Sequence, residues 1–366
     1  MVSQSKIEGI KYPPEPDEFY HVLKYRVQEY FKNSNKSRFG DHRFYLKAVF
    51  LIISFIGLYF ISLFSLNITV AFICYILMGP WSILLGINVA HDAAHKSASS
   101  NQNINWFFLQ LLDIVGANSY IWKRRHVHSH HIYPNIQDYD ADLQQNPLVR
   151  IFPNDPIRPI HKYQKFYAPF LYLFYTLNWL LVRDFSDLKR SRIGSLVKPV
   201  SQRKEFIRLL LFKVFYFTYI LIIPLLLSEL SIVSILLGFV VMNILASLLI
   251  TLALIPSHVA EDSEFPLPNE KAMMPDSWSH HQLKTAIDFA TDNFFLNFFF
   301  GGFNHHVAHH LFPSVCHTHY TNITPIVKIT AAEFGLAYRK QDHFLKAYFS
   351  HFLLLRNNGI QTKNIV

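Results

Sequence analysis

Six of the twenty residues between 301 and 320, GGFNHHVAHHLFPSVCHTHY, are histidines. Three other stretches carry candidate ligands: HDAAH (91–95), WKRRHVHSHHIYPN (122–135) and IPSHVAEDSEFP (255–266). On a helix, residues three or four apart lie on one face, so the paired histidines present their ring nitrogens together. Neutral imidazole is the commonest side-chain metal ligand. The spacing therefore predicts a histidine-ligated metal site.

Nine histidines are the candidate ligands. One metal ion takes about four to six ligands, so nine imidazoles predict two metal ions. No thiolate cluster accompanies them, and the His-Glu-x-x-His pattern of zinc peptidases is absent. The set is His91, His95, His126, His130, His131, His258, His306, His309 and His310.

Polar neighbours are expected to orient the ligand rings. A ring nitrogen that does not bind metal usually donates to a carboxylate, a carbonyl or a water. For Asp92 the alternative is an ordinary charge on a helix surface. The expected orienting or solvated neighbours are Asp92, Asn135, Asp138, Asn304, His305, His128 and His317.

The rest of the chain is strongly apolar. Of its 366 residues, 51% are hydrophobic and 16% charged, whereas soluble domains carry about a quarter charged residues. Apolar runs of roughly twenty residues cross the hydrocarbon core of a bilayer. We predict an all-α integral membrane protein with four transmembrane helices in two hairpins and a cytosolic helical cap that holds the di-metal site. The predicted spans are 48–66, 68–89, 211–228 and 232–255.

Lysine and arginine are missing from both hairpin turns, SLN (65–67) and SELS (228–231), and concentrate elsewhere. By the positive-inside rule, the N-terminal tail, the 91–213 loop and the C-terminal segment lie in the cytosol. All four histidine stretches then share the cytosolic side of a bacterial inner membrane or an endoplasmic reticulum membrane. The net charge of +9 fits this topology and anionic lipid, and not nucleic acid.

Two shorter apolar stretches are open to more than one interpretation. Residues 166–182 form either a fifth span or an interfacial helix, and we prefer the latter because a fifth span would separate the histidine stretches. Residues 105–122 are interpreted as a re-entrant or surface helix. The predicted divisions are a cytosolic tail at 1–47 with a short amphipathic helix at 18–31, a membrane domain at 48–350 and a C-terminal tail at 351–366.

The four stretches resemble the histidine boxes of membrane fatty acid desaturases, in the acyl-CoA and acyl-lipid branch that includes bacterial linoleoyl-CoA-like and front-end enzymes. The second box follows W-x3-H-x3-HH-x3-N from Trp122 to Asn135. HVAEDSEFP and SWSHHQLKT resemble the stretches before the third box, and GGFN…HHLFPSVCHTHY resembles that box itself. The resemblance implies that the nine histidines hold two iron ions, with His306 and His126 as ligands and not His305 and His128.

The resemblance also implies an activity. It is that of a fatty acyl desaturase that introduces a cis double bond into a long acyl chain, carried as acyl-CoA or acyl-lipid, with O2 and two electrons. The sequence has neither a His-Pro-Gly-Gly haem signature nor a Gly-x-Gly-x-x-Gly loop, so a separate donor is expected: ferredoxin, or cytochrome b5 with its reductase. Front-end relatives usually have Gln in place of His306 and an acidic residue in place of Ala308, which leaves the position of the new double bond open.

Two other functions compete with this interpretation. A hydroxylase of fatty acids, alkanes or sphingolipids would use the same scaffold and differ in its product. A histidine-rich metal transporter would need ionisable residues inside its spans, and residues 48–90 contain none.

Overall fold

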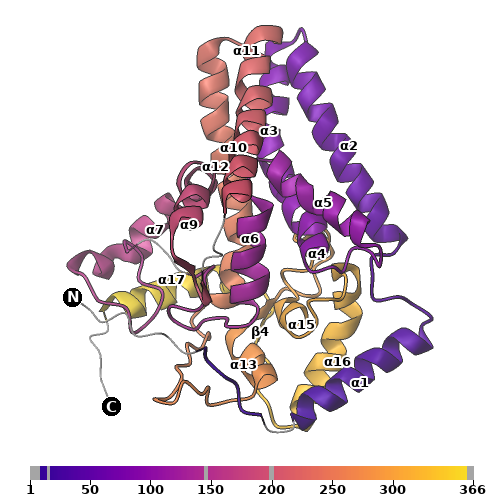
Figure 1. The fold of residues 1–366 in the computed structure, drawn as a ribbon, viewed down its shortest axis with the longest axis vertical. Helices are drawn as coiled ribbons and strands as arrows, with labels where there is room; N and C mark the ends of the chain where they lie inside the picture. Colours follow the sequence, from indigo (N-terminus) through magenta and orange to yellow (C-terminus); the bar gives the residue numbers. More distant parts are fainter. Residues whose placement is uncertain (1–8, 15–16, 144–146, 198–201, 361–366) are drawn as a thin grey trace.

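The spans stand together at one end of the molecule, and shorter helices gather around their other ends (Figure 1). This computed structural model describes residues 9–14, 17–143, 147–197 and 202–360. Within those ranges four helices are long and apolar enough to cross a membrane, which confirms the predicted number. They are α2 (His42–Phe64); α3 (Ile68–Leu85), which continues through a π-helical turn (Gly86–Ala90) into α4 (His91–Ala94); α10 (Arg203–Phe217), which continues through another (Thr218–Ile222) into α11 (Ile223–Leu227); and α12 (Ile232–His258).

Side-chain caps explain where three of these helices begin. Asp41 accepts hydrogen bonds from the Arg43 and Phe44 amides, so α2 begins before the predicted residue 48. Asn67 caps α3, and Ser231 caps α12. Each cap satisfies backbone donors that a helix N-terminus leaves without an intrahelical partner.

The remaining helices are shorter and surround the ends of the spans that carry histidines. Two of them, α5 and α6, replace the single helix expected at 105–122, because Gly116 turns the chain with φ +91°. The bounds are α1 (Glu18–Asn33), α5 (Gln102–Ile114), α6 (Ser119–Arg125), α7 (Gln164–Tyr172), α8 (Tyr175–Asn178), α9 (Asp184–Lys189), α13 (Trp278–Thr285), α14 (Phe294–Phe299), α15 (His306–Leu311), α16 (Tyr320–Glu333) and α17 (Phe344–Ile360).

Strands contribute little to the described residues. The antiparallel pair is β1 (Arg192–Ile193) and β2 (Leu196–Val197), and the parallel pair is β3 (Asp288–Phe289) and β4 (Lys340–Gln341). The apolar stretch at 166–182 is broken into α7, α8 and a π-helical turn (Trp179–Arg183), and it is not one of the candidate spans. Its predicted position at the membrane interface stays a prediction.

Helix α1, predicted from the polar N-terminal tail, is present and packs onto the cap. Its buried residues Phe19, Leu23 and Val27 join Ile323 and Val327 of α16 in one apolar cluster, which also includes residues of α15. At the other end of the chain, α17 continues past the predicted division at residue 350 and packs against the end of α12. Residues 361–366 lie outside the described part, and the predicted divisions remain predictions.

Helices α3 and α12 approach closely where Gly79 faces Met242. A Cβ atom on Gly79 would lie 2.0 Å from the Met242 carbonyl oxygen. We therefore expect Gly79→Ala to lower the free energy of unfolding by about 1–3 kcal/mol through overpacking. Thermal unfolding in detergent micelles measures this effect. Gly57→Ala in α2 is the control, because a Cβ there meets no atom within 4 Å. Equal unfolding midpoints for the two variants would contradict the close approach.

Candidate metal centre

The nine candidate histidines all lie in one buried region at the same end of the spans. His91 and His95 begin and cap α4, and His258 ends α12. The second stretch forms a π-helical turn (His126–His130) directly after α6, and the third stretch forms α15. Each of the nine side chains is at most 8% exposed. Residues more than two hundred positions apart in sequence therefore meet in one site.

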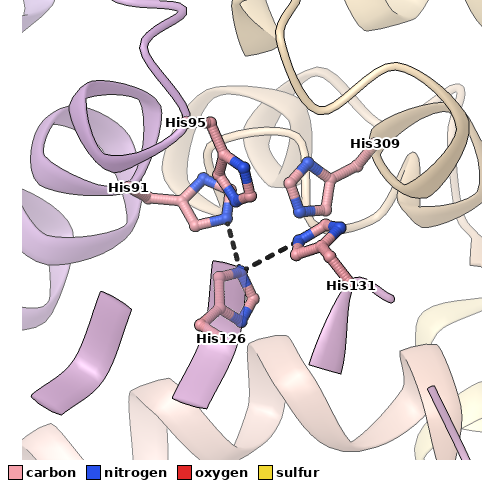
Figure 2. A group of neighbouring side chains, drawn as sticks. All are labelled: His91, His95, His126, His131 and His309. Carbon is pink, nitrogen blue, oxygen red and sulfur yellow. Dashed lines mark hydrogen bonds between the residues drawn. The ribbon is translucent and has the colours of Figure 1, made fainter. Parts of the chain in front are cut away.

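Five of the nine form a first group, drawn in Figure 2: His91, His95, His126, His131 and His309. One ligand atom from each ring lies within 4.8 Å of all the others. The Nε2 atoms of His91 and His131 lie 3.1 and 3.2 Å from His126 Nε2. His95 Nε2 and His309 Nε2 are buried, and neither has a hydrogen-bond partner among the described residues.

The other four form a second group: His130, His258, His306 and His310. His258 Nε2 lies 3.1 Å from His130 Nε2 and 2.7 Å from His306 Nε2. It also lies 2.9 Å from His310 Nε2. The four ring nitrogens therefore converge on one small volume around the end of α12.

The division into two groups differs from the faces predicted by α-helical spacing. His126 and His130 were expected to point together, and their rings do stack, with centroids 5.4 Å apart, but their Nε2 atoms face different groups of histidines. The cause is the π-helical turn, in which the His131 amide donates to the His126 carbonyl at 3.0 Å and closes a wider ring. His126 therefore shares a group with His131, five residues later. In α15 the single predicted face also divides, because His309 joins the first group while His306 and His310 join the second.

A tight turn and a buried carboxylate bring α15 to this position. Gly301 and Gly302 have φ of +56° and +78°, and a Cβ on Gly301 would lie 2.5 Å from the Ile87 carbonyl oxygen. The Val307 amide at the start of α15 donates to Asp288 Oδ1 at 2.8 Å. Burial raises the pKa of Asp288 to about 7, even though hydrogen bonds from Tyr338 and Val307 oppose that rise. The third histidine stretch is thus fixed against the π-helical turn that precedes His91.

The outward-facing ring nitrogens of several ligands are held by acceptors. His126 Nδ1 lies 2.9 Å from Asp142 Oδ2, and His130 Nδ1 lies 2.9 Å from Asp140 Oδ2. His258 Nδ1 donates to the Thr285 carbonyl oxygen at 2.9 Å. The equivalent atoms of His309 and His310 contact Tyr320 Oη and Gln282 Oε1. Such partners fix the tautomer, so that Nε2 carries the free lone pair.

This arrangement fits a bound cation in each group. Because the Thr285 carbonyl only accepts, the proton of His258 is on Nδ1, and its Nε2 offers one lone pair. Three other imidazole nitrogens crowd that lone pair. A shared proton would satisfy one such contact, whereas a metal ion would satisfy all four nitrogens. The chemistry of the donor set, neutral imidazole throughout, suits iron, copper or zinc.

Burial keeps most of these rings neutral. Burial lowers the pKa of His126 to about 4, although the Asp142 carboxylate acts in the opposite direction. It also lowers the pKa of His131 and His309 well below the usual value, and the neighbouring rings add to this effect. For His130, burial acts to lower the pKa, but the Asp140 carboxylate outweighs it and raises the pKa. Neutral rings are the form that binds metal.

The predicted orienting neighbours have mixed outcomes. Asp138 does not take the predicted role: its side chain is exposed, and among the described residues it bonds to no histidine. The carboxylates that hold the rings are Asp140 and Asp142, which follow in the same DYDADL segment. Asn135 supports the site through backbone, because its Nδ2 donates to the His258 carbonyl at 3.0 Å.

The other predicted neighbours lie further from the ring nitrogens. His128 is exposed. His305 contacts Thr324 Oγ1 at 2.8 Å and Asn297 Oδ1 at 3.1 Å, and so faces away from both groups. Asn304 also bonds to Asn297. Asp92 and His317 bond to each other at 2.8 Å beside His91, where Asp92 Oδ1 lies 3.7 Å from His91 Nδ1.

A mostly apolar cavity of about 180 Å³ leads away from the histidines along α3 and α12, and residues of α5 and α8 line it too. His91 and His258 line one end, and Gly79 and Met242 line the wall further along the spans. Gly79 precedes His91 by twelve residues, which is roughly 18 Å along a helix. The cavity therefore reaches into the span region, and its lining suits an apolar chain.

Comparison with known proteins agrees with this geometry. Residues 66–342 match the family model for fatty acid desaturases. The chain therefore belongs to the fatty acid desaturase family, and it is an oxidoreductase that desaturates fatty acyl chains. The predicted family and activity are confirmed.

Three relatives show how far the similarity extends. The sn-1 linoleoyl-lipid 6-desaturase of Synechocystis sp. is 32% identical over 93% of this chain and 95% of its own. An acyl-lipid (8-3)-desaturase of Physcomitrium patens is 31% identical over 94% of this chain and 72% of its own. The sn-1 linoleoyl-lipid 6-desaturase of Arthrospira platensis is 29% identical over 95% of each chain.

The two carboxylates of the DYDADL segment give a direct test of ring support. We expect Asp140→Asn to reduce metal content and activity by about 10–100-fold. The negative charge beside His130 is lost, and the new NH2 group must face either His130 Nδ1 or the Asp142 and Leu143 amides, which are donors themselves. Metal per chain by mass spectrometry and turnover in membranes measure the effect. Asp138→Asn, two residues away and exposed, is the matched control and should retain both. The opposite pattern would show that the wrong carboxylate has been assigned.

Proposed function

We propose that the nine histidines hold two iron ions, five rings in the first group and four in the second. The observation that carries this proposal is the convergence of His130, His306 and His310 on His258 Nε2. Iron is favoured over zinc because desaturation requires the activation of oxygen, and zinc has no redox chemistry. When bound, the metal pair supplies that activation. The ligand roles of all nine histidines are part of this proposal.

We also propose that the substrate is an acyl chain carried on a membrane lipid. The three relatives described above are named as desaturases that act on acyl-lipids. The cavity along α3 and α12 opens onto His91, His126, His130, His258 and His306, and its lining is mostly aliphatic and aromatic. A chain inside it would present one pair of adjacent methylenes to the metals, and the spans would fix how deep the chain enters.

The protein's own contribution is to bind, orient and exclude water. Burial of the nine rings keeps bulk water away from the reacting carbons. Asp140, Asp142 and the Thr285 carbonyl hold the rings in one tautomer. Each turnover consumes two electrons, which we propose come from a separate redox protein of the ferredoxin or cytochrome b5 type.

The proposed setting is a multi-pass membrane protein with its metal centre on the cytosolic side. The four spans place the ends of α4 and α12, with His91 and His258, at one end of the bundle (Figure 1). The basic residues of the 91–213 loop and the C-terminal segment lie on the same side by the positive-inside rule. Such a site would meet a cytosolic electron donor and a lipid substrate at one boundary.

Product analysis tests the proposed activity. Expression in a host that lacks polyunsaturated fatty acids should yield a new cis double bond, located by chromatography with mass spectrometry, in the lipid fraction. A hydroxylated fatty acid without new unsaturation would contradict desaturation. If a labelled fatty acid is supplied, a labelled product that appears first in acyl-CoA would contradict the lipid carrier. The proposed desaturation would still stand.

Two adjacent histidines of the third stretch test the ligand assignment. His306→Ala should abolish activity and lower the iron content, because it removes one of the three ring nitrogens that face His258 Nε2. His305→Ala should retain both, because His305 bonds to Thr324 and Asn297 instead. Iron per chain and acyl products are the two measurements. Loss of iron in His305→Ala alone would mean that the third stretch is assigned one residue out of register.

A further inference from the structure

A buried lysine in the first span has no role in the site described so far. Lys47 of α2 is 9% exposed. Its Nζ lies 2.8 Å from Asn88 Oδ1, 2.8 Å from the Phe298 carbonyl oxygen and 2.9 Å from His317 Nε2. An ammonium group has three N–H donors and no acceptor, so these three contacts satisfy it completely. A buried charge that is so fully enclosed needs an electrostatic partner nearby.

The contact with Lys47 determines the tautomer of His317. Because the ammonium can only donate, His317 Nε2 must accept, and the ring proton is on Nδ1. That proton is donated to Asp92 Oδ2 at 2.8 Å. Lys47 is therefore joined through a neutral imidazole to a buried carboxylate, and the partner that its charge requires is Asp92.

Asp92 lies directly beside a proposed ligand. Its Oδ2 also accepts from the Cys316 thiol at 3.0 Å and from the His317 amide at 3.2 Å. Its Oδ1 lies 3.7 Å from His91 Nδ1, which has no hydrogen-bond partner among the described residues. The other ring nitrogen, His91 Nε2, faces the interior of the first group. The carboxylate is thus on the side of His91 that faces away from the metal.

We propose that Lys47 and His317 are positioning residues of the five-histidine group, which fix Asp92 beside His91 and set how strongly that carboxylate acts on the metal. The inference rests on the proposed metal centre. It gives a function to His317, a histidine of the third stretch that binds no metal in the proposed ligand set. It also connects the first span to the site through side chains alone.

The direction of the effect follows from charge. With Lys47 in place, the negative charge of Asp92 is balanced. Removal of the ammonium leaves that charge uncompensated close to the metals, and a nearby negative charge stabilises the more oxidised state. The midpoint potential of the metal centre should therefore fall. A carboxylate free to reach His91 Nδ1 would also lower the midpoint potential, because it makes the imidazole a stronger electron donor to a metal ion.

The chain offers a matched control in another span. Lys213 of α10 is also buried, and its Nζ donates to Asp184 Oδ2 at 2.8 Å and to the Gly116 carbonyl oxygen at 2.6 Å. In the described structure, neither Asp184 nor Gly116 hydrogen-bonds to any of the nine histidines. Lys213→Met therefore removes a buried lysine–carboxylate pair without touching Lys47, His317 or Asp92.

The experiment compares Lys47→Met, Lys47→Arg and Lys213→Met with the wild type, each purified as the full chain in nanodiscs. The measurements are iron per chain, midpoint potential by electron paramagnetic resonance titration, thermal unfolding, and kcat and KM. We expect Lys47→Met to lower the midpoint potential and to lower kcat by about 10–100-fold without raising KM. Lys47→Arg should recover much of both, because it retains the charge. Lys213→Met should lower thermal stability and leave the midpoint potential at the wild-type value.

The outcomes separate this proposal from a purely structural role. A midpoint potential in Lys47→Met equal to that of the wild type and of Lys213→Met would overturn it. If Lys47→Met does not accumulate, His317→Phe outside the spans interrupts the contact between Lys47 and Asp92 instead. A lowered midpoint potential in His317→Phe supports the proposal, and an unchanged midpoint potential overturns it. A wild-type protein that holds no iron would instead contradict the proposed metal centre.

Discussion

Imidazole lone pairs that face one another in a dry interior are unfavourable unless a cation lies between them. This constraint governs the arrangement around His258, whose single lone pair meets three other ring nitrogens. Acceptors around the site keep the rings in this orientation, because Asp140, Asp142 and the Thr285 carbonyl bind the outward-facing nitrogens. Burial and outward hydrogen bonds thus act together, because each would be costly without the other.

Two of the spans hold histidines of this centre at fixed positions. Helices α3 and α12 meet at Gly79 and Met242, and both end in histidines of the site, His91 at the start of α4 and His258 at the end of α12. The cavity runs along the same two helices. Depth along the cavity is therefore set by helix rise, which is nearly constant, and not by flexible loops. A reaction that must select one carbon–carbon bond in a long chain benefits from such rigidity.

Much of this architecture could be predicted from the sequence, because its signals are strong. Long apolar runs predicted the four spans, and the spacing of histidines within four stretches predicted the nine candidate residues. The division into groups of five and four could not be predicted, because α-helical spacing does not show that His126 Nε2 faces His131 while His130 Nε2 faces His258. The DYDADL segment offers three aspartates, and the sequence does not show which of them faces a histidine: the predicted Asp138 is exposed, whereas Asp140 and Asp142 contact ring nitrogens. Lys47 was missed because it directly precedes the charge-free run and its partners come from distant segments.

The position of α15 in the chain has a consequence for how the protein matures. Helix α12, the last span, ends at His258, whereas His306, His309 and His310 follow almost fifty residues later. Both groups need residues from α15, so neither can be completed while the spans are still being inserted into the membrane. Chain segments emerge in order during synthesis, and a site that is assembled last gains its metal last. Metal uptake would then mark the end of biogenesis, and a chain truncated before α15 would be a membrane protein with half-built sites.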